Sequence, residues 1–142
     1  MDGDGSRWIR PRENTVQALV YGMNECDGVE LDLRLSKDNR LVLHHDSKTE
    51  FGDYPECLSL DELPDYVEPI EDLLEQKDFI RRWTEEGAFT CFEFKSPHPS
   101  SGKAGGWFNA KEREKHMMKM IEELNEILDP IDFSDSSTVI YS

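Results

Sequence analysis

The stretch Val29-Glu30-Leu31-Asp32-Leu33 alternates apolar and acidic residues. A β-strand places successive side chains on opposite faces of a sheet. The three apolar side chains therefore share one face, and the carboxylates of Glu30 and Asp32 point together to the other. We predict a strand over residues 29–35 that buries one face and presents paired carboxylates on the other.

Three further stretches predict strands. The run Leu41-Val42-Leu43-His44-His45-Asp46 predicts a strand over 41–45 that ends in two histidines. The segment Phe92-Glu93-Phe94-Lys95 repeats the alternation, with an acid and a lysine opposite two phenylalanines, and predicts a strand over 89–95. The β-branched run at 138–142 predicts another strand. Carboxylates beside an imidazole are the parts of a divalent-metal site with a proton-transfer group.

Helices are predicted between these strands. Apolar residues at helical spacing predict a helix near 15–25, with Asn14 as its N-cap. A capping box beginning at Ser59 predicts a short helix, and Pro69 fits the first turn of a longer one. An apolar stripe over 117–128 predicts another helix. Because helices alternate with strands, we predict an α/β fold with parallel strand pairing.

The length of 142 residues fits a single domain, residues 1–142. No apolar run is long enough to span a bilayer, and residues 1–12 contain nothing resembling a secretory signal. The three cysteines are widely spaced and form no CxxC pair, which argues against a disulfide framework and a cysteine zinc site. We therefore expect a reducing, cytoplasmic location and no transmembrane segment.

The chain is strongly acidic. Acidic residues outnumber basic ones 31 to 16, which gives a net charge of −15. Such a surface repels phosphate backbones and anionic membranes, so nucleic-acid binding is not expected. Surplus carboxylates are compatible with divalent cations, but their simplest role is to keep the protein soluble. A small anionic substrate would need a local cation, either a bound metal or a lysine.

Glu30, Asp32 and Glu93 are candidate metal ligands. On an antiparallel sheet with one solvated face, such alternation is ordinary. In a β/α barrel, however, alternate residues point inward, where a carboxylate is costly to bury unless it is paired or bound to a metal. Three carboxylates from two strands fit the all-oxygen coordination that Mg²⁺ or Ca²⁺ prefers.

His44, His45 and Lys95 are further candidates. Strand alternation sends the two histidines to opposite sides, so at most one faces the site. Asp46 can orient the ring of its neighbour and favour its protonated form, although a histidine at a strand end is commonly a structural hydrogen-bonder. Lys95 either forms a structural ion pair with Glu93 or contacts a phosphate.

Four short motifs follow one another along the chain: Arg12-Glu13-Asn14-Thr15, Val29-Glu30-Leu31-Asp32, His45-Asp46 and Phe92-Glu93-Phe94-Lys95. In this order they resemble the glycerophosphodiester phosphodiesterase family. That family carries a Pro-Glu-Asn-Thr motif, a Glu-x-Asp strand, a His-Asp after the next strand and a Glu-x-Lys strand further on. The likeness extends over essentially the whole chain, and its specificity lies in the order and spacing of the motifs.

The resemblance implies a TIM-type barrel that uses a divalent metal, Mg²⁺ or Ca²⁺, to hydrolyse a glycerophosphodiester to glycerol 3-phosphate and an alcohol. It implies that Glu30, Asp32 and Glu93 are the metal ligands. It also implies that His45 is one of two proton-transfer histidines and that Lys95 contacts the phosphate of the small-molecule substrate.

The chain departs from the family's pattern. Arg12 stands where the family has proline, and residues 1–5 lack the His-Arg-Gly strand end that supplies the second catalytic histidine. A complete (β/α)₈ barrel also needs about 250 residues. We expect a partial barrel, roughly the first half, lacking the first strand and the later strands. Its open edges should be covered by self-association or by pairing with the missing half.

The leading hypothesis is a metal-dependent phosphodiesterase whose activity is weak or absent in the isolated chain. The first alternative is a non-catalytic binding or scaffold module of the same fold. The second is a phospholipase-type phosphodiesterase that acts on lipid head groups.

Overall fold

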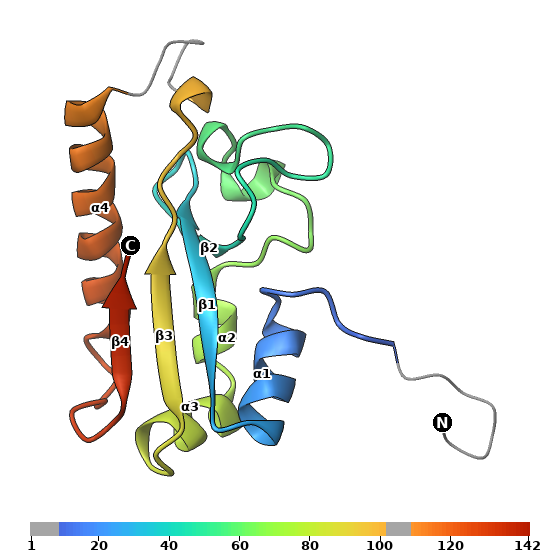
Figure 1. Ribbon diagram of the computed structural model, residues 1–142, viewed down its shortest axis with the longest axis vertical. Coiled ribbons are helices and arrows are strands. Elements are labelled where there is room, and N and C mark those ends of the chain that lie inside the picture. Colours follow the sequence, from blue (N-terminus) through green and yellow to red (C-terminus); the bar gives the residue numbers. More distant parts are fainter. Residues whose placement is uncertain (1–8, 102–108) are drawn as a thin grey trace.

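The computed structural model describes residues 9–101 and 109–142, which form an open sheet in the order β2-β1-β3-β4 (Figure 1). The strands are β1 (Gly28–Leu35), β2 (Leu41–Leu43), β3 (Phe89–Phe94) and β4 (Thr138–Tyr141). The helices are α1 (Val16–Glu25), α2 (Ile70–Leu74), α3 (Lys77–Thr84) and α4 (Ala110–Leu128). Residues 1–5, where the sequence motif lacks its histidine, lie outside the described residues.

Two of the three strand pairs are parallel, as predicted. β1 pairs with β3 so that Asp32 lies opposite Glu93. β3 pairs with β4 so that Glu93 lies opposite Tyr141. The carboxyl ends of these three strands therefore meet at one edge of the sheet, where a barrel carries its working residues.

β2 is the exception, because it pairs antiparallel with β1 and places Leu43 opposite Leu33. The expectation of parallel pairing is wrong here. Residues 36–40 form a tight turn, whereas parallel pairing needs a crossover of about a dozen residues or more. As a result the chain leaves β2 beside Asp32, and the His44 amide donates to the Asp32 carbonyl oxygen at 3.1 Å.

Helices pack against one face of the sheet. The alternate apolar side chains of β1 and β3 join residues of all four helices in a single core. Trp83, Phe79 and Phe92 are fully buried there, and burying side chains of this size stabilises the fold by about 1.5–3 kcal/mol each. The Trp83 indole N–H also donates to Thr138 Oγ1 at 2.9 Å, which ties α3 to β4. The opposite face is left for polar side chains.

The N-cap of α1 differs from the prediction. Thr15, not Asn14, is the cap, and its Oγ1 accepts from the Ala18 amide at 3.2 Å. Asn14 adopts a left-handed backbone with φ of 53°. Its side chain is directed to β1 instead, where it contacts Asp32.

The helical segments after β2 are shorter than predicted. The capping box at Ser59 is present but opens only a 3₁₀ turn, Leu60–Glu62. The long helix expected from Pro69 is divided into α2 and α3 because Gln76 takes an extended conformation, with φ of −78° and ψ of 106°. The break lets α2 and α3 each bury their own apolar side chains.

α4 confirms the predicted apolar stripe. Asn109 caps it by accepting from the Glu112 amide at 2.9 Å. The helix buries Met120, Leu124 and Leu128. Along the two described stretches of the chain, we find no helix with the length and apolar character needed to cross a bilayer.

β4 forms one edge of the sheet. Its residues Val139, Ile140 and Tyr141 are 50%, 47% and 39% exposed. A hollow of about 330 Å³ lies between this strand and α4, lined mainly by apolar side chains that include Phe94 and Ile121. The described edge thus presents an apolar strand to its surroundings.

Candidate active site

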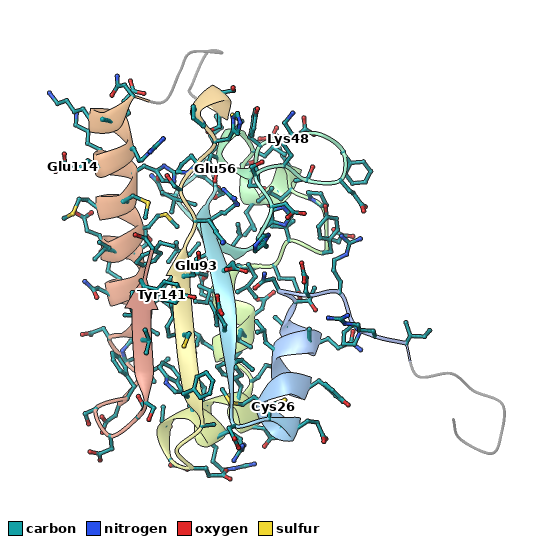
Figure 2. All side chains as sticks on the ribbon, viewed as in Figure 1. Cys26, Lys48, Glu56, Glu93, Glu114 and Tyr141 are labelled. Atoms are coloured by element: carbon teal, nitrogen blue, oxygen red, sulfur yellow. The ribbon has the colours of Figure 1, made fainter. Side chains whose placement is uncertain are left out.

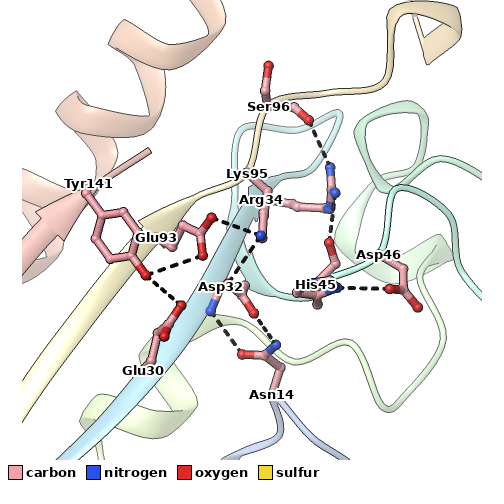
Figure 3. A network of polar contacts seen from close by, with 10 residues as sticks. All are labelled: Asn14, Glu30, Asp32, Arg34, His45, Asp46, Glu93, Lys95, Ser96 and Tyr141. Atoms are coloured by element: carbon pink, nitrogen blue, oxygen red, sulfur yellow. Dashed lines mark hydrogen bonds and ion pairs between the residues drawn. The ribbon is translucent and has the colours of Figure 1, made fainter.

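Three carboxylates converge on the polar face of the sheet (Figure 3), and Figure 2 shows one of them, Glu93, near Tyr141. One oxygen from each of Glu30, Asp32 and Glu93 lies within 4.8 Å of the others. Strand alternation puts the first two on one face of β1, and the parallel register brings Glu93 beside Asp32. The three acids that the sequence singled out are therefore brought together by the fold.

Asp32 is the most enclosed of the three, at 7% exposed. Its Oδ2 accepts from Asn14 Nδ2 at 2.7 Å, and its amide donates to Asn14 Oδ1 at 2.9 Å. Its Oδ1 is buried and has no hydrogen-bond donor among the described residues. Burial raises the pKa of the Asp32 carboxyl, although the Asn14 hydrogen bond acts in the opposite direction.

Lys95 supplies positive charge to this cluster. Its Nζ lies 2.9 Å from Glu93 Oε1 and 3.8 Å from Asp32 Oδ1. The hydrogen bond from Lys95 lowers the pKa of the Glu93 carboxyl. The structural ion pair considered for this lysine is thus present.

The two histidines are directed to different surroundings, but both lie in the loop after β2. The strand predicted over 41–45 ends at Leu43, so strand alternation does not apply to them. His44 Nε2 lies 3.0 Å from the Lys48 carbonyl oxygen, and its ring is tilted against Tyr66 with centroids 6.2 Å apart. Burial lowers the pKa of His44. His44 is therefore held in the loop after β2 as a structural hydrogen-bonder.

His45 is held by its neighbour. Its Nδ1 lies 2.9 Å from Asp46 Oδ1, and its side chain is about half exposed. This hydrogen bond lowers the pKa of the Asp46 carboxyl. The orienting role expected for Asp46 is thus present in the geometry (Figure 3).

Asn14 and Tyr141 belong to this cluster and were missed from the sequence. Asn14 lies in the Arg12-Glu13-Asn14-Thr15 motif, which we interpreted as a helix start. The Tyr141 hydroxyl donates to Glu30 Oε1 at 2.6 Å and lies 3.5 Å from Glu93 Oε2. The hydrogen bond to Glu30 raises the pKa of Tyr141. Alternation along β4 is the only sequence signal that could have placed Tyr141 on this face.

Arg34 was also missed, although it follows Glu30 and Asp32 on the same face of β1. Its guanidinium is 3.1 Å from Glu56 Oε2, and both side chains are almost fully buried. It also donates to the His45 carbonyl oxygen at 2.8 Å. The alternation of β1, continued by one more step, could have identified this residue.

The residues present fit a divalent cation. All the converging acidic donors are carboxylate oxygens, which are the hard ligands that Mg²⁺ and Ca²⁺ select. The buried, unsatisfied Oδ1 of Asp32 is an atom that a cation would satisfy. The single Lys95 ammonium offsets only part of the charge of three acids.

The chain is similar to a known protein family. The model of the glycerophosphoryl diester phosphodiesterase family matches residues 3–130. No curated protein matches the chain significantly. The family match confirms the resemblance that we predicted from the order of four motifs.

Solved structures share the fold at low sequence identity. The glycerophosphodiester phosphodiesterase from Thermotoga maritima is 19% identical, with a TM-score of 0.59 over 90% of this chain and 46% of its own. The enzyme of that name from Parabacteroides distasonis is 19% identical, with a TM-score of 0.64 over 95% and 52%. The one from Agrobacterium tumefaciens is 16% identical, with a TM-score of 0.57 over 92% and 52%.

The chain therefore spans about half the length of the solved structures that it matches. The open, mostly parallel sheet corresponds to about half of a TIM barrel, which confirms the predicted partial barrel. The family model covers most of the sequence. We conclude that this chain belongs to the glycerophosphoryl diester phosphodiesterase family.

Proposed function

We propose that this chain carries the metal-binding half of a phosphodiesterase that hydrolyses glycerophosphodiesters to glycerol 3-phosphate and an alcohol. The observation that carries the proposal is the convergence of three carboxylates on the polar face of two parallel strands. Family membership supports this reaction class. The solved relatives named as such enzymes support it as well.

Glu30, Asp32 and Glu93 are the residues that would hold Mg²⁺ or Ca²⁺. When bound, such a cation neutralises charge on phosphoryl oxygens and orients the ester for in-line attack. Asn14 fixes the Asp32 carboxylate, and the Tyr141 hydroxyl fixes that of Glu30. Both contacts hold the carboxylates in place before a metal binds, so less side-chain conformational entropy would be lost on metal binding.

His45 and Lys95 act on the substrate in this proposal. Because His45 Nδ1 is held by Asp46, its Nε2 is the atom that exchanges a proton with the ester or with water. Lys95 contacts the phosphate and supplies the local cation that a chain of net charge −15 needs for an anionic substrate.

The exposed β4 edge supports a proposal about partners. An apolar edge strand is a ready template for pairing with another strand, and the solved relatives are about twice as long as this chain. We infer that the edge is covered either by a second copy of this chain or by the complementary half of a barrel. The substrate pocket would be completed by the same association.

Metal binding is the first test. Ca²⁺ or Mg²⁺ should raise the melting temperature of the chain, because binding only the folded state stabilises it by about 2.7 kcal/mol at a hundredfold excess over Kd. Glu30→Gln and Glu93→Gln should each remove most of this shift. Glu122→Gln, an exposed acid on α4, is the matched control. A melting temperature that does not respond to either metal would contradict the proposed site.

Hydrolysis is the second test. The substrate is glycerophosphocholine in the presence of the metal, and the release of glycerol 3-phosphate is measured. The chain alone should cleave it slowly, and the chain supplied with the partner half should cleave it faster. His45→Gln should reduce the rate by about 10²–10⁴-fold, which is the range for loss of a general acid–base, while His98→Gln should not. Metal binding without turnover in either form would favour the non-catalytic module. Cleavage of phospholipid head groups in preference to glycerophosphocholine would favour the phospholipase-type alternative.

Asp32→Asn should stabilise the metal-free chain. The buried carboxyl has a raised pKa, so its contribution to stability is fully present below the unfolded value of 3.8 and is lost as the pH rises through the folded value. At neutral pH a neutral amide avoids this loss, and we expect a gain of about 1 kcal/mol or about 3 °C in melting temperature. The gain should vanish near pH 4 and should be absent in Asp61→Asn. A lower melting temperature of Asp32→Asn at neutral pH would contradict this prediction, because it would show that the contacts of the Asp32 carboxylate fully offset the cost of burying its charge.

Association can be tested by sedimentation over a range of concentrations. The average mass should rise above 16.5 kDa, and Ile140→Lys should return it toward this value because a charge opposes strand pairing at the edge. Phe51→Ser removes another exposed apolar side chain, at 71% exposed, and is the control. A compact and highly stable monomer at all concentrations would count against self-association.

A further inference from the structure

We propose that Arg34, together with Glu56, is a positioning residue that fixes the loops after β2 and β3, and with them His45 and Lys95, to the carboxyl end of β1. The proposal rests on the proposed function in naming His45 and Lys95 as the groups that meet substrate. The positioning itself can be measured without catalysis.

The first support is the burial of the pair. The side chains of Arg34 and Glu56 are 4% and 3% exposed, and Arg34 Nη1 lies 3.1 Å from Glu56 Oε2. A buried ion pair contributes little net stability, and a well-packed apolar pair often serves the fold as well. Fixing the orientation of neighbouring groups is a role that such a pair can have.

The second support is where the remaining guanidinium donors point. Arg34 Nη2 donates to the His45 carbonyl oxygen at 2.8 Å, and Nη1 reaches the Ser96 carbonyl oxygen at 3.5 Å (Figure 3). Ser96 directly follows Lys95, whose amide donates to the Leu33 carbonyl oxygen at 2.9 Å. One side chain on β1 thus contacts the backbone of both loops that carry the proposed reacting groups.

The third support is the shape of the group. A guanidinium is planar and holds its donors in a rigid fork, so it can satisfy a carboxylate and two carbonyl oxygens from three segments at once. A lysine ammonium carries one nitrogen on a flexible stem and cannot span the same acceptors. The contacts of Arg34 are distinct from those of Lys95, which is the cation beside Asp32 and Glu93.

The main test uses the charge-neutral double variant Arg34→Gln/Glu56→Gln in the full chain. It removes the fork without leaving an unpaired buried charge, so the fold should be retained. NMR relaxation should show the backbone order parameters at His45 and Ser96 falling from about 0.85 to below about 0.6. The His45 ring signals should move toward those of a free histidine. Arg34→Lys, which keeps the charge, should lose order at the same two positions if the fork is what matters.

Two controls separate positioning from general loss of stability. Leu128→Ala, in the core of α4, can be compared at an equal decrease in melting temperature. Arg40→Met breaks the partly exposed Arg40–Glu71 ion pair of 3.0 Å. Neither should change the order parameters at His45 and Ser96. The proposal is overturned if the double variant keeps both positions as ordered as the native chain, or if Leu128→Ala disorders them equally.

The same variants distinguish this proposal from the proposed function. The Ca²⁺-induced shift in melting temperature should persist in the double variant, because the three carboxylates do not depend on Arg34. If Ca²⁺ changes the melting temperature of neither the native chain nor any variant, the proposed metal site is wrong. The order parameters at His45 and Ser96 still decide the role of Arg34 in that case. With a catalytically competent assembly, loss of Arg34 should lower kcat because His45 is less firmly held, and should raise KM because Lys95 is as well.

Discussion

The parallel pairing of β1 with β3 is the constraint on which the polar face depends. Its register sets Asp32 opposite Glu93, and strand alternation adds Glu30 on the same side. Three carboxylates are thereby held close together although their mutual repulsion opposes it. The apolar side chains buried between the helices and the other face of the sheet supply the folding free energy that offsets this repulsion.

Each of the three carboxylates is held by a different neighbouring side chain. The Asn14 side chain donates to the carboxylate of Asp32 and accepts from its backbone amide. Lys95 donates to Glu93, and Tyr141 donates to Glu30. These three neighbours come from three different segments of the chain. Even so, Asp32 keeps a raised pKa and an unsatisfied buried oxygen. Carboxylates with raised pKa values and unsatisfied buried oxygens are enriched at functional sites.

The antiparallel hairpin of β1 and β2 determines where the loop that carries His45 lies. Because the chain returns along β1, the residues after β2 emerge beside Asp32. His45 is brought to the polar face by this route and is held there by Asp46 and by the guanidinium of Arg34. A turn of a few residues thus decides where the proposed proton-transfer group lies.

The sequence by itself determined the strands, the alternation of β1 and β3, and the order of motifs that predicted the family, because side-chain periodicity and motif spacing are local properties. It also singled out Glu30, Asp32 and Glu93. Only the tertiary structure decided that Asn14 serves Asp32 and not a helix cap, that Arg34 contacts the His45 backbone, and that Tyr141 contacts Glu30. The antiparallel direction of β2 could have been inferred from its short connection to β1. The contacts of Asn14, Arg34 and Tyr141 join residues 11 to 111 positions apart, and the spacing of residues along one chain segment carries no record of such contacts.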